Sequence, residues 1–238
     1  MKRFGKENVV FRTKDESNCE ILKKGILSDD EWMSLDSIAR LDQKIWDDRY
    51  EEECGILSQI ISENNVKHIL EVGSGPGILC NKILKVHKNV VYNLIDIDAA
   101  KKVNLERKLG GNFFTTDLNN GIDVKLKNKV DLFIANDFLE HIQSPAKVIL
   151  DAKEMMNDDA LAFISVPNWR MGHAWIYRGL FDWDNFIHFM WQHGFSFLHY
   201  TPSHIKCPYS KKLDSESTMP DEMINSWNFY LTFKRNDR

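Results

Sequence analysis

Cysteine is scarce in this chain, and its four cysteines lie far apart in the sequence. No two of them form a CxxC pair, so neither a zinc ribbon nor a disulfide-stapled scaffold is indicated. We interpret Cys19, Cys54, Cys80 and Cys207 as small apolar residues of a protein in a reducing compartment.

Long apolar runs are also missing. No run of 18 apolar residues occurs that could span a bilayer, and no apolar core follows the basic start of the chain as it would in a secretory signal. Together with the dispersed cysteines, these absences predict a cytoplasmic protein without a membrane span.

The chain has no excess of positive charge. It carries 31 Lys and Arg residues against 35 Asp and Glu, a formal net charge of −4. Nucleic-acid binding normally needs a clustered basic surface, so we expect no DNA partner. The length of 238 residues, with 43% hydrophobic and 28% charged residues, suits one globular domain with additions.

From residue 66 onward, β-branched runs alternate with amphipathic segments, which is typical of βαβ units and a parallel sheet. We predict helices in the gaps between five strands, at 68–72, 90–96, 112–115, 130–135 and 160–166. A helix over 183–194 then precedes a closing pair of strands, at 195–200 and 227–233. The fold class is α/β, with a domain over 66–238, a helical N-terminal extension or lid over 1–65, and insertions near 167–182 and 201–226.

Residues 68 to 77 read His-Ile-Leu-Glu-Val-Gly-Ser-Gly-Pro-Gly, an apolar strand that runs into three glycines. Gly73, Gly75 and Gly77 allow a ligand to approach the main chain closely. The spacing is GxGxG rather than GxGxxG, and no Lys-Ser or Lys-Thr pair follows, which disfavours dinucleotide and phosphate sites. Glu71 would repel a pyrophosphate but attract a cation, and S-adenosylmethionine carries an ammonium and a sulfonium.

This segment resembles the first motif, ExGxGxG, of the class I S-adenosylmethionine-dependent methyltransferases. The later motifs of the chain are most similar to those of the ubiquinone-pathway, small-molecule and glycan-cluster members. The resemblance implies a Rossmann-like doubly wound sheet, mostly parallel with a final antiparallel strand pair, and S-adenosylmethionine as cofactor.

The resemblance implies two contacts to the nucleoside at the end of the second strand. Asp96 ends the second strand, where a carboxylate accepts hydrogen bonds from ribose hydroxyls, and Ile97 would pack on the adenine ring. Asp98 is the rival for the ribose role, although its place at a helix start also suits an N-cap.

A second pair of residues is assigned to the adenine. The resemblance implies that Asp117 accepts from the adenine amino group and that Leu118 covers the ring. The alternative for Asp117 is an Asx-turn that leads into Asn119.

The fourth strand ends at Asn136, which the resemblance places beside the methionine moiety. His141 follows in a segment where some family members carry a catalytic base, so it is our catalytic candidate, with a structural role as the alternative. Asp137, Glu140 and His141 would share one face of a helix and offer metal ligands. No matched fourth ligand is evident, so we predict no metal.

Aromatic residues gather after the fifth strand, namely Trp169, His173, Trp175, Tyr177, Phe181 and Trp183. We expect them to pack a lid and to line part of an acceptor pocket, with Arg170 and Arg178 available to an acidic group. Stacked rings favour flat or CH-rich ligands. The predicted function is therefore methyl transfer to a small-molecule acceptor, at an oxygen of a ring or sugar-like metabolite. A protein or RNA methyltransferase and a degenerate cofactor-binding subunit are the alternatives, and no oligomeric state is indicated.

Overall fold

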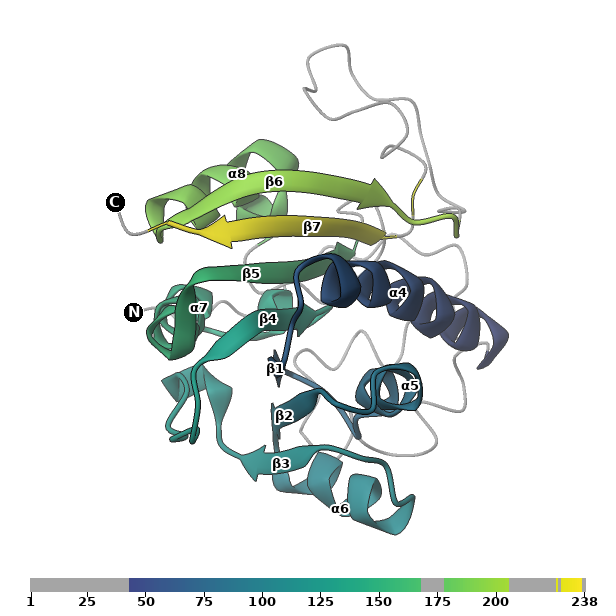
Figure 1. Ribbon diagram of the computed structural model, residues 1–238. Coiled ribbons are helices and arrows are strands. Elements are labelled where there is room, and N and C mark those ends of the chain that lie inside the picture. The colour runs from purple at the N-terminus through teal and green to yellow at the C-terminus, as the bar shows by residue number, and fades with distance from the viewer. Residues whose placement is uncertain (1–42, 168–177, 206–225, 227, 237–238) are drawn as a thin grey trace, which may run out of the picture.

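The computed structural model describes residues 43–167, 178–205, 226 and 228–236. Seven strands form one sheet in the order β3-β2-β1-β4-β5-β7-β6 (Figure 1). The first five are parallel: β1 (His68–Val72), β2 (Val91–Asp96), β3 (Asn112–Thr115), β4 (Val130–Asn136) and β5 (Met156–Pro167). The last two are antiparallel to their neighbours: β6 (Phe195–Pro202) and β7 (Asn228–Arg235). The predicted Rossmann-like, mostly parallel sheet with a closing antiparallel pair is confirmed.

The order of the strands reverses direction at β1. This strand pairs in parallel with β2 on one side and with β4 on the other, where Val72 lies opposite Ala135. Ligands of open α/β sheets bind at the carboxyl ends of the strands that flank such a switch point. The site is therefore expected where β1 runs into the glycine segment and β4 ends at Asn136.

Helices cover both faces of the sheet. On one face lie α4 (Gln43–Glu63) and α5 (Ile78–Val86), and α6 (Asp98–Glu106) packs beside β3. The core under α4 and α5 is built from apolar residues at helical spacing and from alternate strand residues, including Leu57, Ile61, Leu79, Ile83, Leu132 and Ile134.

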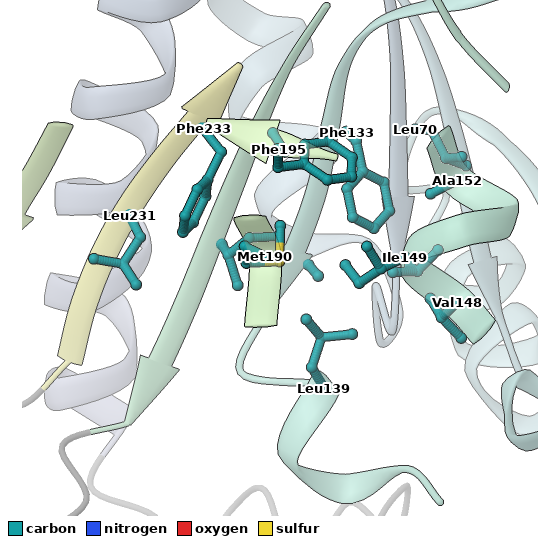
Figure 2. Close-up of a cluster of buried hydrophobic side chains, with 14 of the residues drawn as sticks. Leu70, Phe133, Leu139, Val148, Ile149, Ala152, Met190, Phe195, Leu231 and Phe233 are labelled. Atoms are coloured by element: carbon teal, nitrogen blue, oxygen red, sulfur yellow. The ribbon is translucent and has the colours of Figure 1, made fainter. Parts of the chain in front are cut away.

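The other face is covered by α7 (Pro145–Met155) and α8 (Trp183–Gln192). Pro145 stands at the start of α7, where a missing N–H costs nothing. Figure 2 shows Ile149 and Met190 from the two helices in one buried cluster with Phe133 and Phe233 of the sheet.

The prediction that helices fill every gap is wrong between β3 and β4. Only a short 3₁₀ helix, η3 (Leu118–Asn120), occurs there, followed by irregular chain up to β4. The apolar residues Ile122, Val124 and Leu126 alternate with charged ones and all contact the core. A period of two cannot keep them on one side of a helix.

Strand β5 begins directly after α7, four residues before the predicted start at residue 160. Residues 156–159 lie outside the strand predicted at 160–166. In the structure Met156 pairs with Val130, and the Asn157 side chain donates to Asp131 Oδ1 at 2.7 Å, which anchors this early part of the strand.

Helix α4 is the part of the predicted N-terminal extension that falls within the described residues. The predicted insertions near 167–182 and 201–226 lie mostly outside the described residues. None of the helices that the structure describes is both long and apolar enough to cross a membrane.

Candidate cofactor and active site

The three glycines after β1 all adopt left-handed backbone angles, but they serve different needs. Gly73 has a φ of 63°, and a side chain there would meet the Phe138 ring at 2.1 Å. Gly75 has a φ of 52°, with no atom within 4 Å of the place of a side chain. The missing side chain of Gly73 therefore makes room for Phe138, whereas Gly75 leaves the main chain open to a ligand.

Asp96 joins the end of β2 to the glycine segment. Gly75 N donates to Asp96 Oδ2 at 2.7 Å, and Ile97 N donates to Oδ1 at 2.7 Å. Each carboxylate oxygen can accept a further hydrogen bond. Asp96 is half-buried at the end of β2, while Asp98 is exposed in the first turn of α6.

Asp117 caps η3. Its carboxylate accepts from Asn119 N at 3.0 Å and from the side chains of Asn119 and Asn120 at 3.1 and 3.0 Å. The Asx-turn weighed as the alternative is thus present, and Leu118 is buried. A contact of Asp117 and Leu118 with adenine stays a prediction.

Glu71 lies under α4 and is nearly inaccessible, with 2% of its surface exposed. The Tyr92 hydroxyl donates to Glu71 Oε2 at 2.9 Å. Burial raises the pKa of Glu71 to about 8, and the nearby Glu53 adds to this shift while the hydrogen bond from Tyr92 opposes it. A cation that entered this part of the site would favour the charged carboxylate.

Asn136 is held by α4. Its Nδ2 donates to Glu53 Oε2 at 2.8 Å, and Arg49 Nε donates to Glu53 Oε1 at 2.8 Å. Burial raises the pKa of Glu53 to about 7, against the opposing effect of Arg49. Burial alone would lower the pKa of Arg49, but Asp137 and Glu53 outweigh it and the net shift is upward.

Asp137 turns its carboxylate into the protein. Its backbone has a φ of 44°, and its side chain accepts from Arg49 at 2.7 Å, Ser165 Oγ at 2.6 Å and Asn228 Nδ2 at 2.9 Å. The expectation that Asp137, Glu140 and His141 share a helix face is wrong. The local element is the 3₁₀ helix η4 (Leu139–His141), which Asp137 precedes.

His141 lies beside Glu140 at the end of this segment. Its Nε2 is 3.6 Å from Glu140 Oε1, and its side chain is 20% exposed while that of Glu140 is fully buried. Burial raises the pKa of Glu140 to about 8, with His141 opposing the shift. Within the described ranges, no group of three or more His, Cys, Asp or Glu side chains is placed to hold a metal.

Two of the aromatic residues expected at an acceptor pocket belong to the core. Phe181 is buried and stacks on Phe186 at 5.3 Å between ring centroids. Trp183 packs edge-on against Phe197 at 5.8 Å and Tyr200 at 5.5 Å. The remaining ones, Trp169, His173, Trp175 and Tyr177, and also Arg170, lie outside the described residues, as does the side chain of Arg178.

A family model described as a methyltransferase domain matches residues 45–203, from α4 to the end of β6. The chain belongs to this methyltransferase family. It is therefore an enzyme of the S-adenosylmethionine-dependent class, and S-adenosylmethionine is its cofactor. A search of curated proteins found no match.

Solved methyltransferases share the fold. The plantazolicin methyltransferase BamL, solved with a triazolic desmethylPZN analogue and S-adenosylhomocysteine, is 15% identical over 84% of this chain and 92% of its own, with a TM-score of 0.56. The N-methyltransferase NodS of Bradyrhizobium japonicum, solved with S-adenosyl-L-homocysteine, is 14% identical over 92% and 98%, with a TM-score of 0.54. The mitomycin 7-O-methyltransferase MmcR is 10% identical over 72% and 50%, with a TM-score of 0.51. Identities this low establish the common fold alone.

The structure adds four residues that sequence reasoning missed, namely Arg49, Glu53, Ser165 and Asn228. Arg49 and Glu53 are four residues apart on α4, a spacing that usually marks a pair on a solvated face. Here their side chains are 5% and 0% exposed. The available signal was that both fall on the same side of the helix as the core residues Leu57 and Ile61.

Proposed function

We propose that this methyltransferase moves the methyl group of S-adenosylmethionine to a small-molecule acceptor, at an oxygen of a ring or sugar-like metabolite. The observation that carries the proposal is the pairing of His141 with the buried Glu140 next to the end of β4. A hydroxyl acceptor must lose a proton, and an imidazole beside a carboxyl group is a suitable base.

The proposed cofactor contacts run along the ends of β1, β2 and β4. Gly75 offers the open main chain, and the carboxylate of Asp96 accepts from the ribose hydroxyls. Glu71 and Asn136 lie on the methionine side. The full set is Glu71, Gly73, Gly75, Gly77, Asp96, Ile97, Asp117, Leu118 and Asn136.

The proposed reaction is an in-line displacement, in which alignment of donor and acceptor is the main task. An oxygen lone pair of the acceptor forms the new bond to the methyl carbon while the carbon–sulfur bond breaks. The sulfonium becomes the neutral thioether of S-adenosylhomocysteine. The hydroxyl proton passes to the imidazole of His141.

Calorimetric titration of S-adenosylmethionine into the wild type and two variants tests the cofactor site. Asp96→Ala removes the carboxylate that reaches Gly75, so we expect affinity to fall at least about tenfold, equal to about 1.4 kcal/mol. Asp98→Ala is the matched control, two residues along and exposed, and should bind as the wild type does. Undiminished binding by Asp96→Ala would refute the assignment.

The acceptor class needs a separate experiment. Radiolabelled S-adenosylmethionine is offered with cell extract divided by ultrafiltration into metabolites and polymers. After chromatography has removed unreacted S-adenosylmethionine, we expect label in a new compound of the metabolite fraction alone. Label confined to protein or RNA would instead favour the macromolecular alternative.

The small-molecule proposal is supported by the neighbours in fold. The plantazolicin methyltransferase and the mitomycin 7-O-methyltransferase are named for individual compounds, not for a protein or a nucleic acid. The absence of a basic excess in the sequence also argues against a nucleic-acid acceptor.

A further inference from the structure

The nitrogen of the Asn136 side-chain amide is hydrogen-bonded, whereas its oxygen is not, within the part of the chain that the structure describes. Its Nδ2 donates to Glu53 Oε2 at 2.8 Å, while its Oδ1 is buried and accepts no hydrogen bond from any described residue. A buried acceptor without a partner costs free energy, so such an atom needs an explanation. A ligand that donates to it is one.

The carboxylate of Glu53 sets the orientation of this amide. An ionised carboxylate accepts hydrogen bonds and cannot donate them, so Glu53 selects the nitrogen of Asn136 and turns the oxygen away. Glu53 is in turn held by Arg49, whose Nε donates to Oε1 at 2.8 Å. The guanidinium favours the charged form of Glu53 despite its burial.

Asn136 stands at the switch point of the sheet. It follows Ala135, the partner of Val72, and pairs with Ser165 of β5, so the glycine segment and β5 flank it. Strand alternation places it on the same face as Leu132 and Ile134, under α4. The open oxygen therefore lies on the side of the glycine segment that Glu71 also occupies.

The charges around this oxygen favour a cation. Three carboxyl groups, those of Glu53, Glu71 and Asp137, lie close enough to influence one another, and Arg49 is shared between Glu53 and Asp137. Other titratable groups face them as well, namely Tyr50, Tyr92, Tyr230, Cys80, Asp96 and Glu140. An entering ammonium would lower the pKa of these carboxyl groups and so favour their charged forms.

We infer that Glu53 is a positioning residue of the cofactor site, which orients Asn136 so that its amide oxygen accepts from the α-ammonium of the methionine moiety. This inference rests on the proposed placement of that moiety at the end of β4. Glu53 itself touches no ligand; it acts through Asn136. Helix α4 thereby becomes part of the cofactor site.

The test compares two ligands that differ only at the methionine end. S-adenosylhomocysteine carries the α-ammonium, and 5′-methylthioadenosine has the same nucleoside and thioether without the amino acid. In Glu53→Gln, an amide faces both Arg49 and Asn136 and at most one of the two hydrogen bonds survives. We expect affinity for S-adenosylhomocysteine to fall about tenfold and affinity for 5′-methylthioadenosine to stay within about twofold.

Glu52→Gln is the matched control. Glu52 is the neighbour on α4, and its carboxylate accepts from Ser203 Oγ at 2.6 Å and Tyr230 at 2.9 Å, away from Asn136. Both ligands should bind to this variant as to the wild type. Equal losses for the two ligands in Glu53→Gln, or no loss for either, would overturn the positioning role.

A second variant keeps the inference testable if Glu53→Gln does not fold. Asn136→Leu removes the amide itself and should likewise weaken S-adenosylhomocysteine while sparing 5′-methylthioadenosine. In the double variant the two losses should not add, because both act through one hydrogen bond. Additive losses would contradict the inference. A wild type that binds neither ligand would refute the proposed cofactor site instead.

Discussion

At the scale of single residues, three buried glutamates set the electrostatics of the site. Burial raises the pKa of Glu53 to about 7 and those of Glu71 and Glu140 to about 8. Glu71 and Glu140 therefore keep their protons at neutral pH, where an exposed glutamate has lost its own, whereas Glu53, which accepts from both Arg49 and Asn136, loses its proton near pH 7. The protonation of these glutamates therefore depends on the charge of the ligand that binds beside them.

Glu71 predicts a specific pH dependence of stability. The folded pKa of about 8 lies above the ordinary value of 4.5, so between these values the native state keeps a proton that the unfolded state releases. The free energy of unfolding should fall as pH rises from about 5 to 8, by one to a few kcal/mol from this group alone. Glu71→Gln keeps an acceptor for Tyr92 and should lose this fall.

Urea unfolding of both proteins at pH 5, 6, 7 and 8 measures the effect. Glu154→Gln, at an exposed position on α7, is the control and should follow the wild type. Parallel pH curves for the wild type and Glu71→Gln would contradict the prediction.

His141 carries a prediction about turnover. If its imidazole takes the acceptor proton, His141→Ala should lower kcat by about 10²- to 10⁴-fold. The dissociation constant of S-adenosylmethionine should stay unchanged, because His141 is not proposed to contact the cofactor. Steady-state kinetics with the identified acceptor, together with calorimetry, separate the two quantities. Unchanged turnover would remove the base role and leave the methyltransferase in place.

At the scale of elements, the turn after β1 combines two functions in five residues. Gly73 seats the Phe138 ring from the segment after β4, and Gly75 exposes its main chain. The turn is thus both a packing surface and a proposed ligand surface. Substitution at the two positions should separate these functions.

Gly73→Ala should destabilise the protein by about 2–5 kcal/mol, from the left-handed backbone and from overpacking against Phe138. Gly75→Ala suffers only the backbone strain, about 1–2 kcal/mol, but obstructs the approach to the main chain. Thermal unfolding should therefore rank Gly73→Ala as the less stable. Calorimetry should show that Gly75→Ala loses S-adenosylmethionine binding. Equal destabilisation by the two variants would show that the Phe138 ring can move aside without lowering the stability of the protein.

At the scale of the whole molecule, α4 is tied to distant strands at two places. Arg49 reaches Asp137 after β4, and Asp137 is joined to Ser165 of β5 and Asn228 of β7. Glu52 accepts from Ser203, just after β6, and from Tyr230 of β7. These bonds connect the first described helix to the antiparallel end of the sheet.

Loss of the buried pair should weaken the whole fold. Arg49→Met leaves Glu53 and Asp137 without their cation, and we expect a loss of about 3–5 kcal/mol in the free energy of unfolding at pH 7. The loss should shrink at low pH, where the carboxylates are protonated. Lys82→Met breaks the pair of Lys82 with Glu51, which is 69% exposed, and should cost less than about 1 kcal/mol in the same urea titration. Similar losses in both variants would mean that burial does not strengthen the Arg49 pair.

Most of the sheet could be predicted because its signals are local. Strands β1 and β4 are apolar runs that end in glycine or a polar residue, and the glycine spacing defines the turn. The tie between Arg49 and Asp137 joins residues 88 positions apart, and no local pattern specifies it. The packing of Trp183 on Tyr200 was missed for a different reason, because an aromatic residue suits a pocket and a core equally.

The interior position of β7 has a consequence for biosynthesis. This strand is the last in the sequence among those described, yet it lies between β5 and β6, and its first six residues are buried. β5 and β6 do not pair with each other, so a growing chain exposes an open edge on each until β7 has been made. We expect the nascent protein to depend on chaperones or on slow translation more than the finished one does.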